Sequence, residues 1–200
     1  MLLLVKIKIM KKIIIGLAGH ARSGKDTFCE ITKRFLSKKK VGAARVAFAD
    51  QLKRDLDDLC RNKIGCSAFT EKPEEKKLIR PLLVTYGTEV IRKMDENWWI
   101  EKLEHNLPLY FEQDIIPVVT DVRYPNEMEW IQKKHNGVLI YINRKGIGPA
   151  NTDERENNLI LKKGADYRIV WPTFGEDEAL ERGDPYVRRV MNPILKKHIR

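Results

Sequence analysis

The sequence predicts an α/β fold in three layers, with a five-stranded parallel sheet between helices on both faces. Two observations carry this prediction. Short apolar runs rich in β-branched residues recur along the chain, and segments with helical spacing of apolar residues separate them. A glycine-rich turn joins the first apolar run to the first helical segment, which is the usual place for a binding loop in open α/β sheets.

The first half of the chain supplies two of the five strands. Residues 13–18 form a continuous apolar run that predicts a buried strand, and residues 26–40 show helical spacing ending in three lysines. Residues 45–49 predict the second strand, and a helix with one charged face follows over 52–59. Residues 61–76 are polar and predict irregular structure.

The second half alternates in the same way. Pro81 predicts the first turn of a helix that Gly87 closes, and a second helix is expected over 89–107. The remaining elements are expected, in order, as a strand at 115–120, a helix opening at Pro125, a strand at 138–142, a polar mobile segment at 145–164, a strand at 167–170 and a helix from Pro185.

Length and composition are those of one soluble domain. The chain has 200 residues, 42% hydrophobic and 33% charged, so it can bury a core without disulfides or structural metals. Three cysteines without CxxC spacing favour free thiols in a reducing compartment. The apolar start is too short to span a membrane and makes a poor signal peptide, so residues 1–10 are expected to be a flexible extension.

The net charge of +10 is unevenly distributed. Residues 1–45 contain twelve basic residues against two acidic ones, and residues 186–200 contain five basic residues and no acidic one. A basic end beside a binding loop favours a polyanionic ligand. A nucleic-acid surface is the alternative, but aromatic residues make up 8% of the chain and do not alternate with basic ones, so no nucleic-acid partner is expected.

The stretch GHARSGK, from Gly19 to Lys25, fits the phosphate-loop pattern GxxxxGK, with a strand before it and a helix after it. Glycines let backbone N–H groups turn toward a phosphate, the helix N-terminus adds partial positive charge, and Lys25 reaches the terminal phosphates. A chance glycine-rich turn is the alternative. The candidate nucleotide ligands are Gly19, Ala21, Arg22, Ser23, Gly24, Lys25, Asp26 and Thr27.

Asp26 departs from the general pattern, which places Ser or Thr after the lysine to hold magnesium. Its carboxylate could bind Mg²⁺ directly or through water, or it could cap the helix N-terminus. Thr27 supplies a hydroxyl one residue later, but about 100° further round the helix.

Four blocks resemble the phage-type deoxynucleoside monophosphate kinases, which are P-loop kinases related to adenylate kinase. They are GLAGHARSGKDT, FADQLK from Phe48, YGTE with Arg92, and TDVRYPNE from Thr120, and the resemblance extends from residue 11 to 170. It implies a P-loop kinase fold with a lid-like insertion, and ATP and Mg²⁺ as cofactors. Members often carry His-x-Ser-Glu in the lid-like stretch, where this chain has NTDERE from Asn151 to Glu156.

Roles for further residues follow from strand ends and from the resemblance. Asp121 ends a buried strand, so it is a candidate magnesium or acceptor ligand or else a turn carboxylate, and Arg123 could clamp a phosphate. Arg144 and Arg155 are candidate catalytic arginines of a lid over 145–165. The acceptor region is expected over 50–110, with the candidate ligands Asp50, Lys53, Arg80, Glu89 and Arg92, of which the arginines could instead be solvated charges.

The leading hypothesis is a single-domain, cytoplasmic kinase that uses ATP and Mg²⁺ to phosphorylate a deoxynucleoside monophosphate, in the host cytoplasm if phage-encoded. A homodimer is plausible by resemblance, and no membrane partner is expected. A kinase acting on another small phosphorylated acceptor or on a nucleic-acid 5′ end is one alternative. A nucleotide-dependent binding protein without productive transfer is another.

Overall fold

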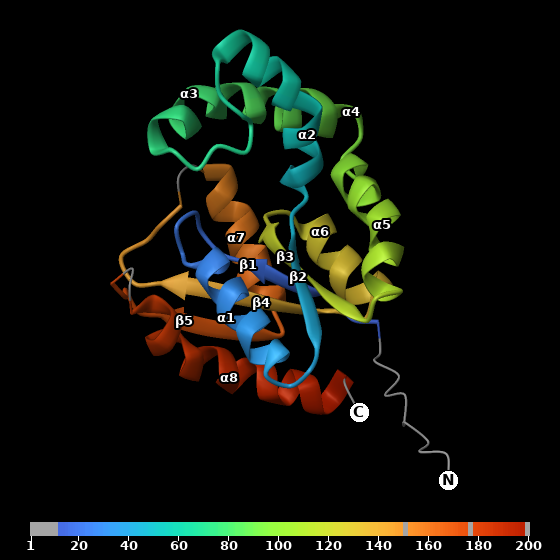
Figure 1. The fold of residues 1–200 in the computed structure, drawn as a ribbon, viewed down its shortest axis with the longest axis vertical. Helices are drawn as coiled ribbons and strands as arrows, with labels where there is room; N and C mark the ends of the chain where they lie inside the picture. The colour runs from blue at the N-terminus through green and yellow to red at the C-terminus, as the bar shows by residue number, and fades with distance from the viewer. Residues whose placement is uncertain (1–11, 150–151, 176–177, 199–200) are drawn as a thin grey trace. The chain divides into compact units, whose positions relative to one another are not determined.

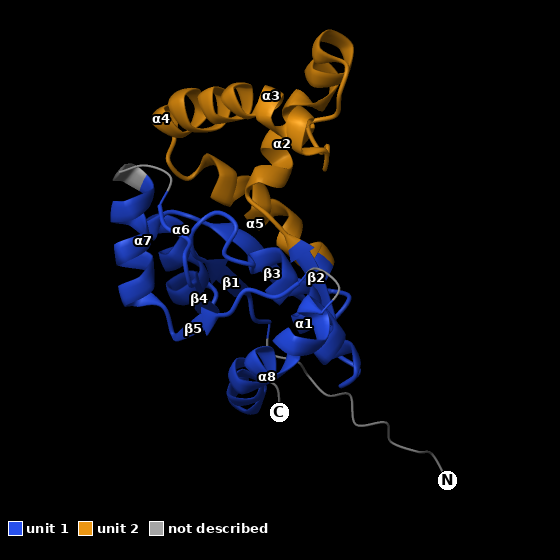
Figure 2. Cartoon of the chain, turned by 90° about the vertical axis from the view of Figure 1, so that its left-hand side faces the viewer, with its two compact units in different colours: residues 1–45, 110–200 blue, residues 46–109 orange. Residues whose placement is uncertain are grey.

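The structure is a computed structural model that describes residues 12–149, 152–175 and 178–198. The chain forms two compact units, which Figure 2 shows in different colours. Residues 1–45 and 110–200 form one, here called the sheet unit, and residues 46–109 form the other, the helical unit. The predicted flexible extension at residues 1–10 lies outside the described residues.

The sheet unit is built on five strands in the order β2-β3-β1-β4-β5. β1 pairs in parallel with β3 and β4, and β4 pairs in parallel with β5. The predicted parallel sheet is therefore confirmed. The strands are β1 (Ile15–Ala18), β2 (Gly42–Val46), β3 (Ile115–Val122), β4 (Val138–Arg144) and β5 (Tyr167–Trp171).

Helices cover both faces of this sheet, as predicted (Figure 1). α1 and α8 pack together on one face, and α6 and α7 contact each other on the opposite face. The pleat of β1 shows the same division, because Ile15 and Leu17 join the core beneath α1 and α8, whereas a Cβ at Gly16 would meet Ile131 and Leu139. The bounds are α1 (Lys25–Ser37), α6 (Pro125–Glu129), α7 (Thr152–Gly164) and α8 (Ala179–His198), and a π-helical segment, Trp130–Lys134, continues α6.

The helical unit has its own small core, in which Leu56, Cys60 and Ile79 are buried. Its elements are α2 (Ala49–Leu59), a π-helical segment (Cys60–Ile64), α3 (Pro73–Val84), a second π-helical segment (Thr85–Ile91), α4 (Arg92–Met94) and α5 (Trp98–Phe111), which ends just past the unit.

Two predicted helix boundaries in the helical unit are wrong. Pro81 lies inside α3, which begins at Pro73, and Gly87 continues the helix as part of the segment Thr85–Ile91. The glycine serves packing, because a Cβ there would lie 2.8 Å from a methyl carbon of Leu52. The helix predicted over 89–107 is interrupted before α5 at Asp95, whose carboxylate accepts a hydrogen bond from the backbone N–H of Asn97 at 2.8 Å.

Three predictions at the edges of the sheet unit also need correction. The second strand is Gly42–Val46 and not 45–49, because Phe48 already has helical φ and ψ before α2. The predicted mobile segment 145–164 contains the helix α7, which buries Asn158 and Leu161. The last helix begins at Ala179 and not at Pro185.

Candidate active site

The glycine-rich loop lies at the carboxyl end of the central strand, between β1 and α1. The chain leaves β1 toward β2 and β3 on one side and later forms β4 on the other. Strand order therefore reverses direction at β1, and ligands of open α/β sheets bind at such a switch point.

The two loop glycines are required by geometry. Gly19 has φ +138° and Gly24 has φ +91°, a region that side chains rarely occupy. A Cβ at Gly19 would lie 2.2 Å from the carbonyl oxygen of Ile142, and one at Gly24 would lie 2.6 Å from Nε1 of Trp171. The loop therefore runs directly against β4 and against the end of β5.

Lys25 is the first residue of α1, and its amine folds back onto the loop. Its Nζ donates hydrogen bonds to the carbonyl oxygens of Gly19 and His20, each at 2.8 Å. Burial and, to a smaller extent, nearby Arg123 lower the pKa of Lys25 to about 8, against the opposing effect of Asp26, Asp121 and Glu154. The charged groups at the end of β3 and in α7 thus lie within electrostatic reach of this amine.

Asp26 is well exposed, at 84% of its side chain, and its Oδ1 lies 3.9 Å from Nε of Arg45. The N-cap of α1 is Gly24, and no side chain caps this helix, so the structure does not support the capping alternative for Asp26. Asp121 is half-buried near the end of β3. Among the described residues no group of three or more His, Cys, Asp or Glu side chains is placed to hold a metal ion.

Two carboxylates nevertheless suit Mg²⁺ in a nucleotide site. Magnesium prefers oxygen ligands and is usually held by one or two carboxylates together with substrate phosphates and water. Asp26 and Asp121 both influence the amine of Lys25, so both lie beside the loop that would receive the phosphates. The donor set fits the ion.

Arg123 follows directly after β3 and is exposed. Its backbone N–H and that of Tyr124 both donate to Oε2 of the buried Glu127, at 2.7 and 3.1 Å. Glu127 closes a capping box at the start of α6, which fixes the turn that presents Arg123. The sequence block TDVRYPNE is therefore partly structural.

Arg144 ends β4 and contacts the loop. Its Nη1 donates to the carbonyl oxygen of Arg22 at 3.2 Å, and its Nε donates to Oγ1 of Thr173 at 3.3 Å. Arg22 has φ 61° and is the one non-glycine residue of the loop with a left-handed backbone. Arg144 therefore contacts the loop at this residue. Arg155, the second candidate lid arginine, is exposed on α7.

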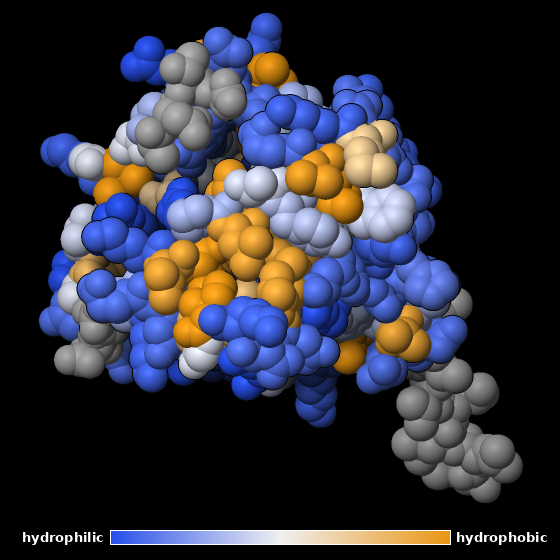
Figure 3. All heavy atoms as spheres, turned by 90° about the horizontal axis from the view of Figure 1, so that it is seen from above, coloured by the Kyte–Doolittle hydropathy of each residue, from blue (hydrophilic) through white to orange (hydrophobic). Residues whose placement is uncertain are grey.

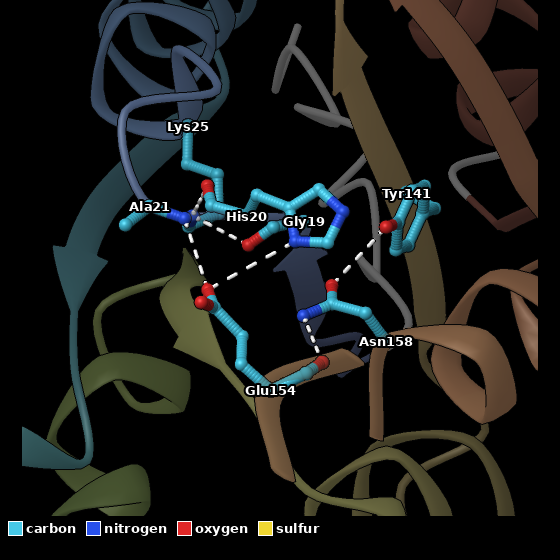
Figure 4. A network of polar contacts seen from close by, with 7 residues as sticks. All are labelled: Gly19, His20, Ala21, Lys25, Tyr141, Glu154 and Asn158. Carbon is cyan, nitrogen blue, oxygen red and sulfur yellow. Dashed lines mark hydrogen bonds and ion pairs between the residues drawn. The ribbon is translucent and has the colours of Figure 1, made fainter. Parts of the chain in front are cut away.

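A glutamate from α7 also contacts the loop, and no role had been predicted for it (Figure 4). Oε1 of Glu154 accepts a hydrogen bond from the backbone N–H of Ala21 at 3.2 Å and lies 4.0 Å from Nδ1 of His20. Burial lowers the pKa of His20, and Glu154 opposes this effect. A signal existed in the sequence, because Glu154 ends the four residues that stand where the family often has His-x-Ser-Glu.

The five candidate acceptor ligands lie in the helical unit. Asp50 is in the first turn of α2, and Nζ of Lys53 lies 5.4 Å from the ring centroid of Phe69. Arg80 is exposed on α3, Glu89 forms an exposed ion pair with Lys93, and Arg92 is half-buried at the start of α4.

A solved structure of another protein shares this fold. Dephospho-CoA kinase from Campylobacter jejuni aligns with a TM-score of 0.51 at 14% identity, over 93% of this chain and 98% of that one. The Mycobacterium tuberculosis APS kinase in complex with AMPPNP and APS aligns with a TM-score of 0.49 at 13% identity, over 92% of this chain and 98% of that one. The likeness to dephospho-CoA kinase concerns the fold, and the loop between β1 and α1 fits the P-loop pattern.

The family can be stated as well. The model of the deoxynucleotide monophosphate kinase family matches residues 45–170, and the chain belongs to this family. It is therefore a nucleotide kinase, a phosphotransferase. The match begins after the glycine-rich loop, so the assignment of the loop depends on its own residues and geometry. No curated protein matches the chain. Among the described residues, no helix combines the length and the apolar character that a membrane span needs.

Proposed function

We propose that this protein transfers the terminal phosphoryl group of ATP to a deoxynucleoside monophosphate and so forms the diphosphate. One observation supports the proposal above all. In a chain of the deoxynucleotide monophosphate kinase family, a glycine-rich loop that ends in Lys25 lies at the switch point of the sheet. Phosphoryl transfer requires positioning and charge neutralisation more than covalent chemistry from the protein, and this site offers both.

The loop and the helix end would bind the donor triphosphate. The N–H groups in the first turn of a helix have no intrahelical acceptor and can bind an anion. In α1 the N–H of Phe28 donates to the carbonyl of Gly24, so the N–H groups before Phe28 would be the ones to bind phosphate. Lys25 would exchange its two carbonyl acceptors for phosphate oxygens. Its lowered pKa of about 8 still leaves the amine mostly protonated at pH 7, and a bound polyanion would raise that pKa again.

Asp26 and Asp121 are the proposed ligands of Mg²⁺, which would neutralise charge on the donor phosphates. Arg123, exposed at the end of β3, would bind a phosphate bidentately. We assign Arg144 to the catalytic set as well, and its present contacts with Arg22 and Thr173 connect it to the loop. Arg155 is the proposed arginine of the lid segment 145–165.

The helical unit is the proposed acceptor region. Asp50 and Lys53 on α2 would contact the nucleoside monophosphate, and Arg80, Glu89 and Arg92 complete the proposed set. The three cations of this set, Lys53, Arg80 and Arg92, suit a monophosphate dianion, to which an arginine can donate two parallel hydrogen bonds.

An acceptor panel tests the proposal directly. ADP release from ATP is followed with each deoxynucleoside monophosphate in turn, and the expected result is turnover with at least one of them. Lys25→Met should keep the fold and abolish this turnover. Saturation by an oligonucleotide end, or ATP binding that no monophosphate affects, would instead favour a nucleic-acid acceptor or a non-catalytic binding protein.

The proposed setting is the cytoplasm of a phage-infected bacterial host. Cys29, Cys60 and Cys66 are free and buried, which is compatible with a reducing compartment. We also propose a homodimer. The side chains of Leu159 and Val170 in the sheet unit are exposed, as are those of Leu78 and Met94 in the helical unit. Figure 3 shows hydrophobic residues among hydrophilic ones on the surface that it presents. Sedimentation of the protein at two concentrations tests this association.

A further inference from the structure

Two charged side chains from other elements form hydrogen bonds with the backbone of the phosphate loop at Ala21 and Arg22. Glu154 accepts the N–H of Ala21 at 3.2 Å, and Arg144 donates to the carbonyl of the next residue, Arg22, at 3.2 Å. The arginine suits a loop that is to receive phosphates. The carboxylate is unexpected there, because it brings a negative charge toward a site for a polyanion.

Glu154 is held in this place by a buried polar anchor. Nδ2 of Asn158 donates to the backbone carbonyl of Glu154 at 2.8 Å, and Oδ1 of Asn158 accepts the hydroxyl of Tyr141 at 3.1 Å. Asn158 is 6% exposed and Tyr141, on β4, is 2% exposed. A buried amide is costly unless it is hydrogen-bonded; the bond from Tyr141 joins α7 to β4, and the bond to the Glu154 carbonyl connects that anchor to the first turn of α7.

The hydrogen bond is made at Ala21 and not at the N-terminus of α1, although Glu154 also lies within electrostatic reach of the Lys25 amine. Ala21 lies four residues before Lys25, and the N–H of Ser23 closes a turn onto the carbonyl of His20 at 3.1 Å. The N–H groups of the α1 N-terminus, which favour phosphate by charge and direction, stand at the other end. Glu154 therefore holds the bend of the loop and leaves the helix end to a ligand (Figure 4).

We propose that Glu154 is a positioning residue: it fixes the backbone of Ala21 so that the phosphate loop keeps its binding shape before the donor arrives. This inference rests on the proposed function, in which the loop binds the triphosphate of ATP. The rival interpretation is that the carboxylate stands in for a phosphate and that the donor must displace it. The two interpretations predict opposite effects on nucleotide affinity.

Two substitutions at one position separate them. Glu154→Gln keeps an oxygen that accepts the Ala21 N–H and removes the charge, whereas Glu154→Ala removes both. Amide hydrogen exchange of Ala21, followed by NMR, reports the hydrogen bond, and calorimetry with a non-hydrolysable ATP analogue reports affinity. Glu156→Ala is the matched control, because Glu156 is exposed on the same helix and carries the same charge.

A positioning role predicts that Glu154→Ala raises the exchange rate of Ala21 and weakens analogue binding by about tenfold each, the scale of one lost hydrogen bond. Glu154→Gln and the control should stay within about twofold of the wild type. If Glu154→Ala does not fold, Glu154→Asp, which is one methylene shorter, is expected to behave in the same way.

Tighter analogue binding in both the Gln and the Ala variants would overturn the proposal in favour of the rival. Unchanged Ala21 exchange in Glu154→Ala would also overturn it. A wild-type protein that binds no ATP analogue would reject the proposed function, and the exchange of Ala21 would still decide whether Glu154 holds the loop.

Discussion

Gly24→Ala is the most informative single change to the phosphate loop. The glycine has φ +91°, and an alanine Cβ would lie 2.6 Å from Nε1 and 2.9 Å from Cδ1 of Trp171. Trp171 is 2% exposed, with ring centroids 5.8 Å from Phe28 and 5.2 Å from Phe174, so it has little room to move. A left-handed alanine costs about 1–2 kcal/mol, and the overpacking adds about 1–3 kcal/mol.

Gly146→Ala is the matched control for this change. Gly146 has φ +83°, and no atom lies within 4 Å of its added Cβ, so this variant carries the backbone cost without the clash. Urea unfolding followed by circular dichroism should show Gly24→Ala to be less stable than Gly146→Ala by about 1–3 kcal/mol. Equal losses of unfolding free energy in the two variants would refute the packing of Trp171 against the loop.

Three further predictions concern a proposed metal ligand, the buried amine and the helical unit. Asp26→Asn should raise the Mg²⁺ concentration for half-maximal turnover by about tenfold or more, and an unchanged Mg²⁺ titration would exclude it as a ligand. The pKa of Lys25 falls from 10.5 to about 8 on folding, so the unfolded chain binds more protons between these values. The unfolding free energy of the wild type minus that of Lys25→Met should therefore increase from pH 8 to pH 10.5, by at most about 3 kcal/mol. A difference that does not change with pH would contradict the burial of the amine. Trp99→Phe should lower the free energy of unfolding by about 1–3 kcal/mol, because Nε1 of the buried Trp99 donates to the Gly87 carbonyl at 3.1 Å. Trp98→Phe, at the exposed neighbour, is the control and should lower it less. A larger loss in Trp98→Phe than in Trp99→Phe would be inconsistent with that hydrogen bond.

The sheet and its loop were predictable because their signals are local. Residues 13–18 are apolar on both faces, which a strand buried between two helical layers requires. Gly19, Gly24 and Lys25 stand at fixed spacing directly after that strand, and the structure places them at the switch point. Periodicity and turn chemistry thus sufficed for the parts of the chain that the central strand organises.

The errors arose where tertiary contacts override local preference. Pro81 and Gly87 are usual helix boundaries, but helical structure continues through both, and Gly87 allows close packing against Leu52. The segment that contains α7 was predicted to be mobile because it is polar. One of its polar residues, Asn158, is buried and accepts a hydrogen bond from Tyr141 on a distant strand.

The sequence marked the position of Glu154 but did not predict its contact with the loop. Its partner Ala21 is 133 residues away, and the contact is made to a backbone N–H, which does not depend on the identity of Ala21. Similarly, Arg144 contacts the loop through the carbonyl of Arg22. Side chains that bind distant backbone groups require the folded structure to be found.

Product stoichiometry tests the central claim most directly. ATP, Mg²⁺ and the best acceptor of the panel are incubated with the wild-type protein and with Lys25→Met, and the nucleotides are separated and quantified. The account predicts that ADP and the deoxynucleoside diphosphate appear in equal amounts and that the variant forms neither. ADP without the diphosphate, or equal product from the variant, would contradict it.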